Sequence, residues 1–203
     1  MIILEVKPAR KHRYLLVLDE CEMLLDSETV EQHKLKAGVK LTHEQLEKLK
    51  LHSNCIRALS KGSWLLGQRD YSCKGLRDML LPDFGEYASD YAIGQLESVG
   101  ALNDERYANL MAEYYAEYKN LSRKAIVQEL YKKGISRATA QTAAENLEYD
   151  HTDAIVRIIS AKYRGYATDE KIKRRMIAAL QRKGFTFREI NTAIDQINEE
   201  NGY

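Results

Sequence analysis

The sequence has little of what breaks helices, cross-links small folds or crosses membranes. Only 2 of its 203 residues are proline, so long stretches are free to be helical, because proline disrupts a helix interior. The 3 cysteines are odd in number and lack a Cys-x-x-Cys spacing, which argues against both a disulfide framework and a zinc site. No apolar run approaches the length of a membrane span or forms a secretory signal, so we expect a cytoplasmic protein.

Signatures of catalysis are missing as well. The sequence contains neither of the glycine-rich loops that cradle nucleotide phosphates, and its 5 histidines are scattered without metal-ligand spacing. Two acidic pairs, Asp104-Glu105 and Asp169-Glu170, lie where helices are expected to begin, and carboxylates there favour the positive end of the helix. We therefore expect a protein that is not an enzyme and has no cofactor or metal.

The first 54 residues differ in pattern from the remainder. Two short β-prone runs, Ile2–Val6 and Tyr14–Leu18, and a possible third at Met23–Leu25, predict a small β-ribbon. Thr42 and Gln45 have the spacing of a capping box, which predicts that a helix begins there. Residues 1–54 are thus expected to form a β-ribbon and helical lead-in.

Beyond this extension the sequence repeats itself without a gap at a shift of 50 residues, Ser122–Leu147 matching Ile172–Ile197. Each copy ends one helix at a glycine, Gly134 or Gly184, where a C-cap favours a left-handed backbone. A hydroxyl residue follows two positions later as an N-cap, and an apolar stripe with helical spacing follows that. Each copy is therefore predicted to be a pair of helices joined by a tight turn.

A weaker third copy lies upstream, where Ser72, Leu76 and Leu80 match at the same shift, and the match resumes one residue out of step after Pro82. A further helix precedes each copy, at about 55–68, 104–119 and 152–164, giving three helices per unit. The predicted fold is mainly α-helical, with three tandem three-helix repeats in an elongated array behind the N-terminal extension. The predicted domains are 1–54, 55–101, 102–149 and 150–203.

The 13 tyrosines could either stack on nucleic-acid bases or fill cores. Tyr107, Tyr114 and Tyr118 keep helical spacing with Met111, which is typical of a core face, and we expect these three to be buried. Tyr131 adjoins two lysines and stays open to either interpretation.

Basic residues are the remaining candidate site. The net charge is only +1, but the stretch from Arg157 to Arg188 is densely basic. A charge run is usually a solvated face, yet here the clusters recur at equivalent places in successive units, which favours an extended binding strip. The candidate binding residues are Arg69, Arg123, Lys124, Lys132, Lys133, Lys173, Arg174, Arg175, Arg182, Lys183 and Arg188.

Two segments carry a resemblance to a known family. The segment Leu102–Ala108, followed by a helix and then by Leu130-x-x-Lys133-Gly134-Ile135, closely resembles the RecX family of recombinase regulators. The upstream segment Leu65–Ser72 is similar to that family's Leu-x-x-Arg-x-Tyr-Ser motif. The resemblance spans about residues 55 to 198.

The resemblance implies a function that the residues alone do not name. RecX-like proteins consist of tandem three-helix repeats, bind the RecA recombinase and lie along the groove of its filament on DNA. They thereby inhibit ATP hydrolysis, strand exchange and coprotease activity, which implies a role in recombination, DNA repair and the SOS response. We expect this chain to do the same as a monomer. The alternatives are a helical DNA-binding protein without a recombinase partner and a purely structural adaptor.

Overall fold

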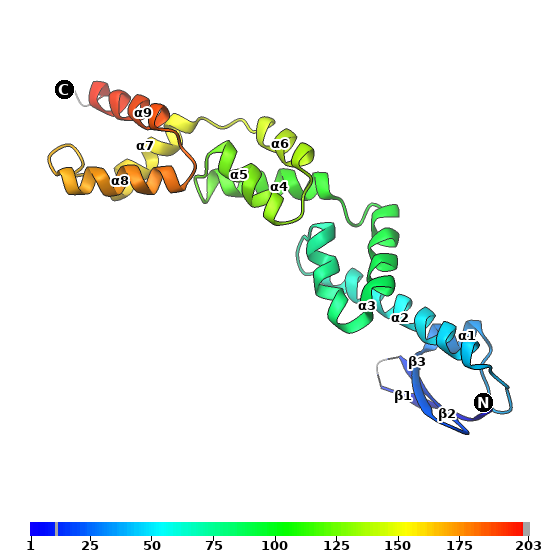
Figure 1. Ribbon diagram of the computed structural model, residues 1–203. Helices are drawn as coiled ribbons and strands as arrows, with labels where there is room; N and C mark the ends of the chain where they lie inside the picture. The colour runs from blue at the N-terminus through cyan, green and yellow to red at the C-terminus, as the bar shows by residue number, and fades with distance from the viewer. Residues whose placement is uncertain (11, 201–203) are drawn as a thin grey trace. The chain divides into compact units, whose positions relative to one another are not determined.

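The computed structural model describes residues 1–10 and 12–200, and residues 201–203 of the last predicted repeat lie outside them. The chain divides into two compact units, one from Met1 to Asn103 and one from Asp104 onward (Figure 1). Helices account for most of the described residues, and a small antiparallel sheet lies at the N-terminus. The predicted fold class, mainly α-helical with an N-terminal β extension, is confirmed. Every helix in the described part of the chain is too short or too polar to cross a bilayer.

The N-terminal sheet has the order β1-β2-β3, with β1 at Ile3–Ala9, β2 at Arg13–Leu18 and β3 at Glu22–Asp26. All three strands are antiparallel to their neighbours, as short connections between strands require. Alternate residues are buried, including Leu16 on the central strand and Leu25 on β3, so one face of the sheet forms the core of the extension.

Helix α1 (Ser27–Gln32) follows the sheet, and α2 (His43–Leu66) begins at the predicted capping box of Thr42 and Gln45. Its N-terminal half contributes Leu46 and Leu49 to the core under the sheet, and its C-terminal half contributes Ala58 and Leu65 to the next core. The proposed domain boundary between residues 54 and 55 therefore lies inside a continuous helix that both parts share.

Helix α3 (Cys73–Ser98) is capped by Ser72, as the repeat pattern predicts, and is kinked at Gly85, whose φ is +75°. Gly85 lies 49 residues before Gly134, whereas Ala92 lies 51 residues before Ala143, so the segment from the glycine to the matched apolar residues is two residues shorter in this copy. On both sides of the kink the matched apolar residues, such as Leu80 and Ala92, are fully buried against α2.

The second unit contains two three-helix modules. The first consists of α4 (Asp104–Glu117), α5 (Arg123–Lys132) and α6 (Arg137–Glu145), and is called here the α4–α6 module. The second consists of α7 (His151–Lys162), α8 (Glu170–Arg182) and α9 (Phe187–Glu200), and is called the α7–α9 module. Each encloses its own apolar core, and Tyr149, between them, packs partly against both.

Equivalent residues form equivalent cores in these modules. Ile126 and Leu130 on α5 correspond to Met176 and Leu180 on α8, and all four side chains are fully buried. Burial of one such side chain contributes about 1.5–3 kcal/mol. Each module thus closes its core through the same two positions, one helical turn apart.

Candidate functional site: the basic corners of the last two modules

The turns after α5 and α8 have the same geometry. Lys133 and Lys183 are the C-caps, and the following glycines, Gly134 and Gly184, have φ of +88° and +89°. In each turn the glycine N–H donates to the carbonyl three residues before it, and the next residue's N–H donates to the carbonyl of the buried leucine. This is the pattern of a Schellman C-cap, and it makes the two turns equivalent corners that present basic residues.

Most of the predicted basic residues are exposed. Lys124 on α5 and Arg174 on α8 are equivalent and exposed. Lys132 and Arg182, the last residues of the same two helices, are also equivalent and exposed. Lys132 forms an ion pair with Glu129, at 2.6 Å, but two thirds of its side chain stays accessible. The other exposed candidates are Arg69, Lys133, Arg175 and Arg188, while Lys173 is half-buried.

Arg69 belongs to the first unit, separate from the two modules. Its guanidinium lies 4.5 Å from the centre of the Tyr71 ring, a cation–π contact. Arg69 is therefore not one of the corner residues.

Arg123 is held inside the α4–α6 module. Its Nε donates to the carbonyl of Ala144 at 3.1 Å, and its Nη2 donates to the carbonyl of Leu147 at 2.9 Å. The Ala144 carbonyl lies in the last turn of α6, where backbone acceptors lack partners within the helix, and Leu147 directly follows the C-cap Asn146. The structure therefore gives the Arg123 side chain a role in closing α6.

The corner at Lys183 differs from its counterpart because it docks on the α4–α6 module. The N–H of Ser122 donates to the carbonyl of Lys183 at 3.0 Å, and Lys183 Nζ donates to the carbonyl of Lys119. Burial lowers the pKa of Lys183, and the nearby charges of Lys162 and Lys119 lower it further. Lys183 thus contacts the segment of Lys119 and feels the charge of two lysines from other segments at this joint.

Lys119 and Lys162 were not among the predicted site residues. They are 43 residues apart and lie outside the repeated corners. No local pattern connects them, since only the docking of the α8–α9 turn on the start of α5 brings both near Lys183. Their positive charge was the one feature of the sequence that could have pointed to these two residues.

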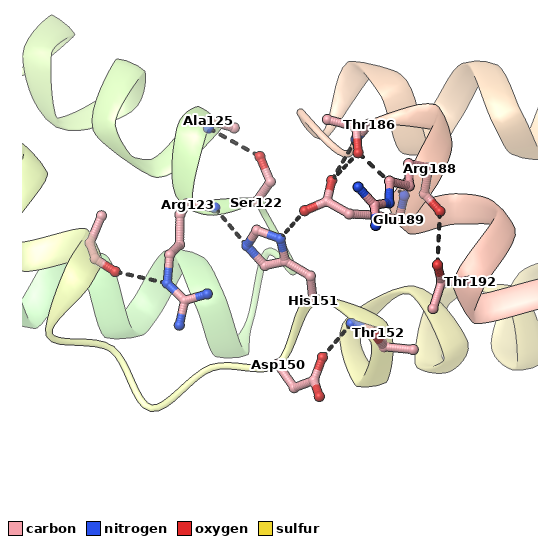
Figure 2. Close-up of polar contacts among 11 residues, drawn as sticks. Ser122, Arg123, Ala125, Asp150, His151, Thr152, Thr186, Arg188, Glu189 and Thr192 are labelled. Carbon is pink, nitrogen blue, oxygen red and sulfur yellow. Dashed lines mark hydrogen bonds and ion pairs between the residues drawn. The ribbon is translucent and has the colours of Figure 1, made fainter. Parts of the chain in front are cut away.

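His151 forms a second contact between the modules (Figure 2). The N–H of Arg123 donates to its Nε2 at 3.1 Å, and its Nδ1 is hydrogen-bonded to the carboxylate of Glu189. Because Nε2 accepts, this arrangement requires the neutral ring with its proton on Nδ1. The ring also lies edge-on to Phe185, at 5.5 Å between centres. His151 therefore ties the start of α5 to α9.

Glu189 is fixed in turn by a capping box with Thr186, the hydroxyl residue two positions after Gly184. Its Oε2 accepts hydrogen bonds from the Thr186 N–H and hydroxyl, both at 2.7 Å, and its own N–H donates to Thr186 Oγ1. Burial by itself would raise the pKa of Glu189, but the hydrogen bonds from Thr186 and His151 outweigh burial and lower it. The carboxylate is thus held in its charged form at the joint.

The expectation that Tyr107, Tyr114 and Tyr118 form one core face was wrong for two of the three. Tyr107 is buried, whereas 39% of Tyr114 and 73% of Tyr118 is exposed. Tyr115 is buried instead, because the core stripe of α4 is centred on the fully buried alanines Ala108 and Ala112. Small residues let α4 approach its neighbours closely, which turns the face with Tyr114 outward.

The two exposed tyrosines form a small aromatic platform. Their rings stack at 5.5 Å between centres with an interplanar angle of 27°. The ammonium of Lys119 lies 5.5 Å from the centre of the Tyr114 ring, a cation–π contact. Tyr131, next to Lys132, is also exposed.

No cluster of three or more potential metal ligands occurs among residues 1–10 and 12–200. A pocket of about 730 Å³ lies beside the α7–α8 loop and is lined by residues such as Ser160, Tyr166 and Asn198. The basic corners remain the candidate site.

Comparison with known proteins agrees with this architecture. Residues 103–143 match a family model described as the second three-helix domain of RecX, and residues 148–194 match its third three-helix domain. These ranges correspond closely to the two modules of the second unit. The class of protein is therefore a helical protein with tandem RecX three-helix domains.

Relatives over nearly the whole chain point the same way. The chain is 22% identical over 194 residues to regulatory protein RecX of Streptococcus gordonii, covering 94% of this chain and 75% of the relative. It is 25% identical over 182 residues to regulatory protein RecX of Clostridioides difficile, covering 88% and 86%. The chain belongs to the RecX family.

Solved structures share the fold. A crystal structure of regulatory protein RecX superposes with a TM-score of 0.71 at 18% identity, covering 96% of this chain and 98% of the other. The RecX structure from Lactobacillus salivarius gives a TM-score of 0.62 at 21% identity, covering 71% and 97%.

Proposed function

We propose that this protein is a cytoplasmic, non-catalytic regulator that binds the RecA recombinase and the DNA in the groove of its filament. By doing so it inhibits recombinase, ATPase and coprotease activity. The relatives' shared name, regulatory protein RecX, supports a regulatory role. The partner follows from the resemblance, and the basic corners are the residues proposed to meet it.

The observation that carries the proposal is the repeated placement of exposed basic side chains. Lys124 and Lys132 on α5 have exposed counterparts, Arg174 and Arg182, at the same positions of α8. Within each helix the two cations are eight residues apart, which is about 12 Å along the axis. A repeat of this kind suits a partner with regularly spaced negative groups, such as a phosphate backbone or a repeating acidic protein surface.

The test is ATP hydrolysis by RecA on single-stranded DNA, with this protein added substoichiometrically. We expect inhibition by the wild-type protein and a marked loss of inhibition in the double variant Lys132→Glu/Arg182→Glu. The matched control is Lys36→Glu/Lys48→Glu, which makes the same change in net charge at exposed lysines of the first unit. It is expected to inhibit like the wild type.

The outcomes separate the alternatives. Full inhibition by Lys132→Glu/Arg182→Glu would contradict the assignment of the corners. Binding of the wild type to naked DNA without any effect on RecA would favour a DNA-binding protein that acts without a recombinase. Absence of both activities would favour a structural adaptor.

A further inference from the structure

An exposed aromatic pair lies next to a concentration of positive charge at the joint between the two modules. Tyr114 and Tyr118 stack on each other at the C-terminal end of α4, and the more exposed ring, Tyr118, directly precedes Lys119 in the chain. An exposed pair of stacked rings keeps at least one flat apolar face in water, where a third planar group can add to the stack.

Lys119 contacts the Tyr114 ring and connects this pair to two further lysines, which belong to the other module. Lys119 follows α4, Lys162 ends α7, and Lys183 caps α8. Lys183 Nζ donates to the Lys119 carbonyl, and the backbone contact from Ser122 holds the two segments together. The charged neighbours that act on Lys183 are both lysines, and together with its burial they lower its pKa. This mutual repulsion would be relieved by an anion at the joint.

We propose that Tyr114, Tyr118, Lys119, Lys162 and Lys183 form a binding site for a single-stranded segment of nucleic acid. A base stacks on the exposed face of the tyrosine pair, and the adjoining phosphates lie against the lysines. Flat aromatic faces beside a basic surface are how proteins hold single strands without sequence preference. The phosphates of a duplex can contact the lysines, but its bases stay paired and stacked on one another. An acidic peptide has carboxylates for the lysines but no base to stack on the tyrosine rings.

This inference deepens the proposed function, because it names the form of nucleic acid that is met at the joint and the residues that meet it. The experiment needs no recombinase, so its failure can be told apart from failure of the proposed function. It measures binding of the full-length protein to a fluorescein-labelled oligothymidylate of about 20 nucleotides by fluorescence anisotropy at low salt.

The aromatic arm of the test compares three variants. Tyr114→Ala/Tyr118→Ala is expected to weaken binding by about 5- to 150-fold, since stacking on an aromatic side chain contributes about 1–3 kcal/mol per base. Tyr118→Phe keeps the ring and is expected to bind like the wild type. Tyr87→Ala is the matched control, because Tyr87 is similarly exposed, at 64%, but its neighbours on α3 include the acidic Asp83, Glu86 and Asp90.

The lysine arm uses Lys119→Gln/Lys162→Gln, which leaves the docking contacts of Lys183 in place. The slope of log affinity against log salt should become shallower by about 1.4, since each single-strand phosphate contact contributes about 0.7. Unlabelled duplex of the same length and polyglutamate should compete poorly with the oligothymidylate. Circular dichroism of every variant checks that the fold is retained.

Three results would overturn the inference: no binding of the oligothymidylate by the wild type, equal binding by the tyrosine double variant, or better competition by duplex or polyglutamate. A protein that binds the oligothymidylate as expected but leaves RecA unaffected would instead refute the proposed function and leave this site intact.

Discussion

Replacing Gly184 by alanine tests whether the α8–α9 turn holds the two C-terminal modules together. With a φ of +89°, this position costs an alanine about 1–2 kcal/mol in backbone strain. A Cβ there would also lie 2.3 Å from Ser122 Oγ and 2.8 Å from the Cβ of Ala125. Rotating Ser122 relieves the first contact but breaks its N-cap hydrogen bond to the Ala125 N–H, and the second contact forces the turn away from α5.

These losses set the expected magnitude. An N-cap contributes about 1 kcal/mol and a backbone hydrogen bond such as that from Ser122 to Lys183 about 0.5–1.5 kcal/mol. We expect Gly184→Ala to lower the free energy of unfolding by about 2.5–4.5 kcal/mol. Gly134→Ala is the matched control, because Gly134 has nearly the same φ, and it should cost about 1–2 kcal/mol. Urea unfolding followed by circular dichroism measures both.

A double-variant cycle isolates the contact itself. Ser122→Ala alone should cost about 1 kcal/mol, and it should cost less in the Gly184→Ala background, where the hydroxyl is already displaced. Equal losses at Gly184 and Gly134, with strictly additive effects of Ser122→Ala, would refute the docking of the turn on α5.

Two further predictions concern the same joint. Glu189→Gln should make the fall in the free energy of unfolding on acidification less steep. Because the pKa of Glu189 is lowered in the folded protein, its carboxylate contributes stability above the unfolded pKa of about 4.3, and this contribution is lost as the pH falls through the folded pKa. Unfolding curves of the wild type and the variant at a series of pH values would contradict this if both lost stability in parallel. Arg123→Lys should lower the free energy of unfolding, measured in urea, by about 1–2 kcal/mol, because the lysine ammonium lacks the planar fork with which the guanidinium reaches the carbonyls of both Ala144 and Leu147. Arg137→Lys, at an exposed site, should leave this free energy unchanged. Equal stability of both variants would contradict a structural role of the Arg123 side chain.

The corners were predictable from sequence because each is determined within a few residues. The glycines at 134 and 184 follow the last buried leucine of a helix, and the side-chain hydroxyls at 136 and 186 start the next helix. Capping chemistry of this kind acts over three or four positions, so the repeat pattern carries it completely. The exposure of the equivalent basic residues follows from the same helical spacing.

The tyrosines mark a limit of that reasoning. Spacing groups Tyr114 with Tyr107 and Met111 as readily as it groups Tyr115 with them, so spacing alone does not identify which tyrosine faces the core. The direction of burial was decided by Ala108 and Ala112, through which α4 packs closely on its module. A small residue in a core has little signal in sequence, because alanine is also common on exposed helix faces.

By itself, the sequence of this RecX-family chain determined the repeat, the helix ends and the basic character of its corners, since all three depend on neighbouring residues. Tertiary structure decided that the corner at Lys183 docks on the α4–α6 module: Lys183 meets Ser122 and lies near Lys119 and Lys162, whereas the Lys133 side chain is exposed. The two corners have the same local chemistry. Only the packing of one module on the other, across contacts up to 64 residues apart in the chain, makes them different.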